Sequence, residues 1–229
     1  MRPNRVCNFV YTSGTTGMPK GVMLTHDNMT YYMQTALADA LADYRKDEKE
    51  TEKIISYLPL SHVAGQFFDL MAPLFNKVTI TFAQPDALSG SLIETLKEVR
   101  PTIFLAVPRI YEKMEEKMKG IAATVGPIAK KISTWAKKKG SENSMNLQDK
   151  KQSPFGYGLA NFLILSRVKD ALGLDQCKIM VYGAAPMKKS TLDYFLSLDM
   201  QIFNFYGMSE TSAAETICWK NRVKFDRAG

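Results

Sequence analysis

The sequence has few cysteines and histidines and no long apolar run. Its three cysteines, Cys7, Cys177 and Cys218, are odd in number and widely spaced. Such cysteines predict free thiols in a reducing compartment, so we expect a cytoplasmic protein. Two histidines without a CxxC pair argue against a structural zinc site. No apolar stretch approaches the length needed to span a bilayer.

Acidic residues are scarce in the middle of the chain, where the positive charge gathers. The net charge is +7, and between Lys113 and Lys151 ten lysines stand against four acidic residues, a net of +6. The remainder is nearly neutral, which argues against a nucleic-acid binder. The lysines from Lys130 to Lys139 lie on a predicted amphipathic helix, residues 127–139. Such a helix can lie on an anionic membrane, or it can be a solvated helix with its apolar stripe on the core.

Apolar runs and helical patterns alternate along the chain and predict an α/β fold. Asp27 is the expected cap of the first helix. The alternation predicts a mostly parallel sheet flanked by helices, with ligands at the carboxyl ends of strands. The polar stretch at residues 140–156 predicts a solvated loop. The predicted strands are residues 7–11, 54–58, 78–82, 103–107, 178–182 and 201–205, and the predicted helices are 28–44, 88–99 and 159–172.

The most informative segment is YTSGTTGMPKG, residues 11–21. Seven of its eleven residues are Ser, Thr or Gly, and Lys20 stands among them. Glycines let backbone N–H groups approach an anion, and a lysine adds positive charge. The segment therefore predicts a loop that binds the phosphates of a nucleoside triphosphate; a flexible surface loop is the alternative. A Walker loop is excluded because Gly21 follows Lys20, where that motif needs Ser or Thr.

The segment QIFNFYGMSETS, residues 201–212, runs from a predicted strand into a polar turn. Tyr206 offers a flat ring on which a purine could stack, and Gly207 allows a turn. Glu210 offers an oxygen ligand for Mg²⁺. A surface carboxylate or a helix cap is the alternative interpretation of Glu210.

Two further strand ends carry weaker signals. The segment VYGAAPM, residues 181–187, contains small residues against which a planar base could lie. It also fits a plain turn in which Pro186 opens the next helix. In LPLSHVAGQ, residues 58–66, His62 follows a strand end and could act on a substrate carboxylate or be structural.

Taken in order, YTSGTTGMPKG, LPLSH, YGAAPM and YGMSET resemble the adenylate-forming superfamily of acyl-CoA synthetases, luciferases and peptide-synthetase adenylation domains. The resemblance spans residues 11–211. AVPRIYEKMEEKM resembles long-chain fatty acyl-CoA synthetases, and GTTGMPKGVMLTHDN and FNFYGMSET are similar to their bubblegum-type branch. The resemblance implies a long-chain fatty acid–CoA ligase that uses ATP, Mg²⁺ and coenzyme A.

The resemblance also implies roles for individual residues. His62 would lie beside the reacting carboxylate, and Lys20, Thr211 and Glu210 would serve catalysis. Glu210 and Thr16 would hold Mg²⁺. The residues that it implies for ATP binding are Thr12, Ser13, Gly14, Thr15, Thr16, Gly17, Met18, Pro19, Lys20, Gly183, Ala184, Ala185, Asn204, Phe205, Tyr206, Gly207, Met208, Ser209, Glu210 and Thr211.

Parts of the family pattern have no counterpart in this sequence. They are the acidic residue that grips the ribose, the hinge and C-terminal domain with its lysine, and much of the region before the phosphate loop. We therefore expect residues 1–229 to be the central part of an AMP-binding (adenylation) domain, truncated at both ends, with a lysine-rich helix and polar insertion at about 113–156. Such a chain is expected to bind ATP weakly and to catalyse little or nothing.

Two other functions fit the residues. Another adenylating enzyme of the superfamily would share the ATP motifs and differ at residues 105–155. A short isoform without catalysis could instead bind a membrane or a partner through its lysine-rich helix. For the ligase we expect a cytoplasmic location, peripheral on the endoplasmic reticulum or other membranes. No nucleic-acid partner is expected.

Overall fold

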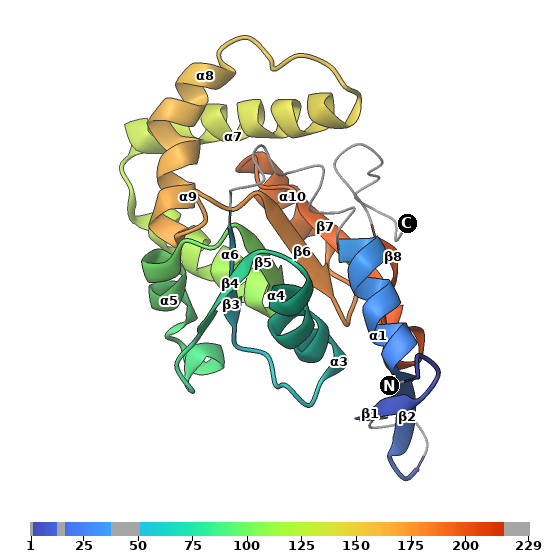
Figure 1. Ribbon diagram of the computed structural model, residues 1–229. Coiled ribbons are helices and arrows are strands. Elements are labelled where there is room, and N and C mark those ends of the chain that lie inside the picture. The colour runs from blue at the N-terminus through green and yellow to red at the C-terminus, as the bar shows by residue number, and fades with distance from the viewer. Residues whose placement is uncertain (1, 13–16, 38–50, 218–229) are drawn as a thin grey trace. The chain divides into compact units, whose positions relative to one another are not determined.

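The computed structural model describes residues 2–12, 17–37 and 51–217 (Figure 1). The chain divides into two compact units. Unit 1 comprises Met1–Thr95 and Tyr206–Glu215, and unit 2 comprises Leu96–Phe205 and Thr216–Gly229. Both units combine helices with parallel strands, which confirms the predicted α/β class. No helix in the described ranges is both long and apolar enough to cross a bilayer.

Unit 1 contains two small sheets. β1 (Val6–Thr12) and β2 (Lys20–Thr25) form an antiparallel hairpin. β3 (Glu52–Ser56) pairs in parallel with β4 (Val78–Phe82). The helical elements are α1 (His26–Tyr32), η1 (Met33–Leu37), α3 (Val63–Gly65), η2 (Gln66–Met71), α4 (Ala72–Phe75), η3 (Ala87–Ser89) and η5 (Ser209–Thr211).

Helix α1 is fixed by its cap and by an aromatic contact. The Thr25 hydroxyl accepts the Asn28 N–H at 3.2 Å, and the Asn28 side chain accepts the Thr25 N–H at 3.0 Å. Asp27, the predicted cap, instead lies in the first turn, so that prediction was wrong. The chain passes directly from β2 into the helix, which places the cap at the last residue of β2. At the other end, Tyr32 packs edge-to-face on Phe67 at 4.9 Å.

The sheet of unit 2 contains parallel strands in the order β5-β6-β7. These are β5 (Ile103–Ala106), β6 (Ile179–Gly183) and β7 (Ile202–Met208), whose last residues belong to unit 1. β8 (Ala213–Ile217) lies beside β7. The helical elements are the second half of α5 (Leu92–Val99), α6 (Pro108–Thr124), α7 (Pro127–Gln148), α8 (Tyr157–Ala160), η4 (Asn161–Leu165), α9 (Ser166–Leu172) and α10 (Lys189–Ser197).

An aromatic cluster joins the helices of unit 2 to its sheet. The Tyr111 ring of α6 lies edge-on to Phe104 of β5 at 5.8 Å and to Phe195 of α10 at 5.4 Å. Its hydroxyl donates to the Val181 carbonyl of β6 at 3.0 Å. All three rings are almost fully buried, so their burial contributes strongly to the stability of this unit.

Helix α7 runs further than predicted and includes half of the stretch expected to be a loop. Its Gly140 approaches α10 so closely that a Cβ would lie 2.2 Å from the Ser197 carbonyl oxygen. The Ser144 hydroxyl donates to the Leu196 carbonyl at 3.1 Å. The loop prediction was therefore wrong as far as Gln148, because small and polar residues are buried here against the end of α10.

Other boundaries differ less. The predicted helix at 28–44 is observed to residue 37, and its remainder lies outside the described residues. Pro186 does not open a helix, because α10 follows Lys188, whose backbone is extended. The strands β2 and β8 were not predicted. Their segments, KGVMLT and AAETI, lack a continuous β-branched or aromatic run.

Candidate functional site

The phosphate-loop motif lies at the end of the β1–β2 hairpin in unit 1. Thr12 and Lys20 pair across its base, and the Thr12 hydroxyl donates to the Lys20 carbonyl at 3.4 Å. Gly17 has a φ of +124°, which favours glycine. A strand, not a helix, follows the loop, in agreement with the exclusion of a Walker loop. Ser13, Gly14, Thr15 and Thr16 lie outside the described residues.

The second motif folds as a tight turn between β7 and β8. The Thr211 side-chain oxygen accepts the Met208 N–H at 3.1 Å and lies 3.3 Å from the Ala213 carbonyl. Ser212 adopts a left-handed conformation with a φ of +61°. A Cβ on Gly207 would lie 1.7 Å from the Ala213 carbonyl oxygen, so only glycine fits there. The turn is therefore fixed by its own sequence.

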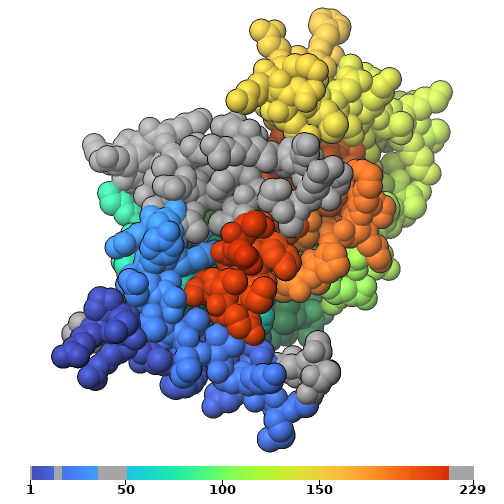
Figure 2. Space-filling view, turned by 90° about the vertical axis from the view of Figure 1, so that its right-hand side faces the viewer, coloured from blue at the N-terminus to red at the C-terminus, as the bar shows by residue number. Residues whose placement is uncertain are grey.

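These two motifs meet within unit 1. The turn η5 lies next to β2, the second strand of the hairpin. Figure 2 shows the red residues of this turn and of β8 against blue residues from the N-terminal part of the chain. Lys20 and Glu210 are exposed, and the Tyr206 side chain is 51% exposed. A cation, a carboxylate and an aromatic ring are thus presented to solvent by neighbouring elements.

His62 lies in the same unit, just before α3. Its Nδ1 accepts the Ala64 N–H at 3.1 Å, so the imidazole caps this short helix while remaining exposed. Three residues on, Gly65 packs where a Cβ would lie 2.7 Å from the Pro59 carbonyl oxygen. This close approach fixes the turn that carries His62.

The segment after His62 is tied to the hairpin. The Asn8 side chain of β1 donates a hydrogen bond to the Gln66 side chain at the start of η2. Further along η2, the buried Asp69 accepts the Ser56 hydroxyl at 2.7 Å. Burial raises the pKa of Asp69 to about 6, although the Ser56 hydrogen bond opposes the shift. Sequence patterns gave no sign of the Asn8–Gln66 contact, because its partners are far apart in the chain.

The remaining predicted residues form a separate group in unit 2, at the carboxyl ends of β6 and β7. Gly183 pairs with Phe205, and the neighbouring Tyr182 pairs with Asn204. A Cβ on Gly183 would lie 3.0 Å from the Phe205 carbonyl oxygen. Ala184 follows with a φ of +68° and is exposed. Ala185 is exposed as well, so small residues stand at the end of β6, where a planar base could approach.

The described site residues thus fall into two groups. In unit 1 the turn η5 lies next to β2, and the segment that begins at His62 is tied to β1 through the Asn8–Gln66 hydrogen bond. Unit 2 holds Gly183, Ala184, Ala185, Asn204 and Phe205. The first group offers a lysine, hydroxyls and a carboxylate, a set of side chains suited to a polyphosphate with a divalent cation.

Comparison with known proteins identifies a family to which this chain is similar along almost its whole length. The sequence model of the family described as "AMP-binding enzyme" matches residues 1–228. The long-chain-fatty-acid–CoA ligase ACSBG2 of Gallus gallus is 46% identical over 94% of this chain and 28% of its own length. The ACSBG2 of Homo sapiens is 42% identical over all of this chain and 34% of its own length. The chain therefore spans about a third of these relatives.

Solved structures support the fold. The o-succinylbenzoate coenzyme A synthetase of Bacillus subtilis in complex with AMP has a TM-score of 0.59 at 19% identity, covering 96% of this chain and 33% of its own. The A-PCP didomain of a carboxylic acid reductase from Segniliparus rugosus, in complex with AMP, has a TM-score of 0.59 at 23% identity. This match covers 90% of the present chain and 24% of the didomain.

Proposed function

Because the chain belongs to the AMP-binding enzyme family, we propose that it forms the ATP-handling core of a long-chain fatty acid–CoA ligase. One observation carries the proposal: within unit 1, the turn η5 lies next to β2 of the hairpin that bears the phosphate-loop motif. ATP and coenzyme A are the co-substrates, and a long-chain fatty acid is the acid that is activated.

In the first step, a carboxylate oxygen of the fatty acid attacks the α-phosphorus of ATP. The bond from the α-phosphorus to the bridging oxygen breaks, and pyrophosphate leaves with its electron pair. Both partners are anions, so the site must neutralise charge and align them. Lys20 and the hairpin loop bind the β- and γ-phosphates, Tyr206 stacks on the adenine, and Thr211 contacts the α-phosphate.

The family resemblance also assigns Gly183, Ala184, Ala185, Asn204 and Phe205 of unit 2 to adenine binding. His62 lies beside the acyl carboxylate. Glu210 would hold Mg²⁺, because its exposed carboxylate supplies the oxygen ligand that this ion prefers; Thr16, the other proposed ligand, lies outside the described residues. The ion supplies positive charge for the phosphates when it is bound.

In the second step, the sulfur of coenzyme A attacks the carbonyl carbon of the acyl-adenylate. The bond from that carbon to the AMP oxygen breaks, the thiol proton is lost, and the thioester and AMP are the products. The chain spans only 28–34% of the two ACSBG2 relatives, so we expect weak ATP binding and little turnover from these 229 residues alone.

Titration calorimetry with MgATP tests the proposal. Lys20→Ala and Tyr206→Ala should each weaken binding roughly 10-fold, through loss of a charge-assisted contact and of base stacking. Tyr206→Phe retains the ring and should bind like the wild type. Lys77→Ala removes a lysine elsewhere in unit 1 and serves as the charge control. Undetectable MgATP binding, or binding that neither alanine variant weakens, would contradict the proposal.

The substrate class needs a separate test. Another adenylating enzyme of the superfamily, acting on amino acids or shorter acids, would share the nucleotide motifs. A long-chain acyl sulfamoyl adenosine should therefore compete with MgATP far better than an aminoacyl sulfamoyl adenosine. The reverse order would remove the fatty-acid assignment while leaving the nucleotide site in place.

We also propose a cytoplasmic location with peripheral contact to the endoplasmic reticulum or other membranes. Two observations support it. Cys7 and Cys177 are free thiols, which suits a reducing compartment. The lysines from Lys130 to Lys139 all lie on one helix, α7. Fractionation of cells that express a tagged chain tests the location, and a purely soluble distribution would contradict the membrane contact.

A further inference from the structure

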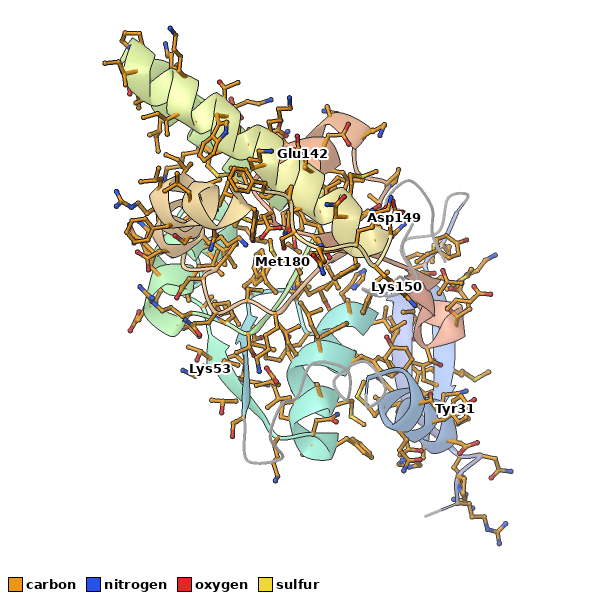
Figure 3. The ribbon with its side chains drawn as sticks, turned by 90° about the horizontal axis from the view of Figure 1, so that it is seen from above. Tyr31, Lys53, Glu142, Asp149, Lys150 and Met180 are labelled. Atoms are coloured by element: carbon orange, nitrogen blue, oxygen red, sulfur yellow. The ribbon has the colours of Figure 1, made fainter. Side chains whose placement is uncertain are left out.

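The corner between α6 and α7, residues 121–132, carries four exposed apolar side chains of unit 2. Ile121 is 62% exposed, Val125 36%, Ile128 75% and Ile132 39%. In Figure 3 the end of α7 opposite to Glu142 and Asp149 extends beyond the neighbouring helices. Globular cores bury side chains of this size, so four of them in one corner indicate a surface that meets another phase or molecule.

The charge around this corner is of one sign. From Lys117 to Ser141 the sequence has seven lysines and no acidic residue. Lys130 and Lys131 are exposed, and the described residues include no ion-pair partner for either. Apolar side chains beside uncompensated lysines match the boundary between the headgroups and acyl chains of an anionic bilayer.

The second half of α7 is packed against the rest of unit 2 and is less exposed than the first half. Lys137 lies over the Tyr194 ring, 4.6 Å from its centroid, and burial lowers the pKa of its ammonium. Lys139 forms an ion pair with Glu142 at 2.8 Å. Gly140 is buried against the Ser197 carbonyl. The helix therefore anchors into unit 2 by its second half and presents its first half.

We propose that the α6–α7 corner, and not the whole lysine-rich helix, inserts into the surface of an anionic membrane. The apolar side chains enter the acyl boundary, while Lys130 and Lys131 contact lipid phosphates. This placement sharpens the membrane contact proposed above and does not depend on ligase activity. It would hold the protein at the phase in which a long-chain fatty acid dissolves.

Co-sedimentation of the 229-residue chain with phosphatidylcholine vesicles, with and without phosphatidylserine, tests the placement. The wild type should bind the anionic vesicles and not the neutral ones. The double variants Lys130→Glu/Lys131→Glu and Ile121→Ser/Ile128→Ser should each weaken binding at least about 10-fold. All four side chains are exposed, so the variants should fold, and circular dichroism checks this.

The matched control is Lys150→Glu/Lys151→Glu, the same charge reversal at two adjacent exposed lysines just beyond the other end of α7. It should weaken binding by less than about 3-fold, because these lysines lie away from the corner. Equal losses from both lysine pairs would overturn the placement, as would equal binding to neutral vesicles. Self-association that Ile121→Ser/Ile128→Ser abolishes would assign the corner to a second copy of the chain. The affinity for MgATP should be unchanged in every variant. A negative result with the vesicles would therefore overturn the membrane proposal without affecting the proposed nucleotide site.

Discussion

Each unit holds an aspartate away from solvent, but the two carboxylates are compensated differently. Asp199 of unit 2 lies in the turn between α10 and β7 and adopts a φ of +57°. Three side chains donate to it. They are the Tyr157 hydroxyl at 2.7 Å, the Asn143 amide at 2.8 Å and the Lys169 ammonium at 3.0 Å. Asp69 of unit 1 accepts the Ser56 hydroxyl, and within the described residues it forms no ion pair.

The two aspartates differ in what surrounds their charge. Around Asp199 a cation offsets the buried charge, and the donors come from α7, α8 and α9, so one carboxylate joins three helical elements to one turn. Around Asp69 no cation offsets the charge, and burial raises the pKa of the carboxyl to about 6. The weakly compensated acid belongs to the segment that begins at His62. The stability of unit 1 should therefore depend on pH near the proposed site.

The largest effect should come from breaking the network in unit 2. Asp199→Ala leaves Lys169 without its partner and removes an acceptor from three donors, so we expect a loss of about 3–5 kcal/mol in the free energy of unfolding. Urea unfolding measures it. Asp170→Ala is the matched control, because its ion pair with Arg100 at 2.7 Å is largely exposed and should contribute under about 1 kcal/mol. Equal losses in the two variants would remove the distinction between the networks.

The second prediction concerns the pH dependence of unit 1. The pKa of Asp69 rises from 3.8 to about 6 on folding, so the folded state favours the protonated acid. The contribution of Asp69 to the free energy of unfolding is fully present below about pH 4. It is lost as the pH rises through 6, and the loss amounts to at most about 3 kcal/mol. Asp69→Asn should remove this dependence and unfold at higher urea than the wild type at neutral pH.

Urea unfolding between about pH 4 and pH 7 provides the comparison. Asp193→Asn is a suitable control, because Asp193 is exposed on α10 and its pair with Lys189 is long at 3.4 Å. That variant should keep the wild-type pH profile. A parallel profile for Asp69→Asn would show that the buried acid does not titrate in this range.

The sequence predicted the positions of six strands well and the tertiary contacts poorly. The strand predicted at 78–82 coincides with β4, and four of the other five have both ends within two residues of an observed strand, because continuous apolar runs define them. β7 runs three residues past its predicted end at Phe205. The continuation of α7 was missed because Gly140 and Ser144 look like loop residues until α10 packs on them. Within the site, the motifs could be recognised singly, but the position of η5 next to β2 depends on the fold.

A third prediction tests that packing. Gly140→Ala adds a methyl group where a Cβ would lie 2.2 Å from the Ser197 carbonyl oxygen, so α7 must move away from the turn that carries Asp199. We expect a loss of roughly 2 kcal/mol in the free energy of unfolding, despite the better helix propensity of alanine. Gly120→Ala, in α6, meets nothing within 4 Å and should gain about 0.5–1 kcal/mol. An unchanged free energy of unfolding for Gly140→Ala would show that the contact between Gly140 and Ser197 is loose.

The smallest effect should arise at His62, where unit 1 combines a structural contact with a proposed chemical one. His62→Ala removes the acceptor for the Ala64 N–H and should cost about 1 kcal/mol in the free energy of unfolding. His62→Asn restores a side-chain acceptor at the cap, so its unfolding should stay close to that of the wild type. If the imidazole also faces the acyl carboxylate, both variants should bind a long-chain acyl sulfamoyl adenosine more weakly while MgATP affinity is unchanged. Normal binding of the acyl analogue by His62→Asn would restrict His62 to its capping role. Asparagine and histidine can both accept the N–H at the cap, but only histidine carries an imidazole.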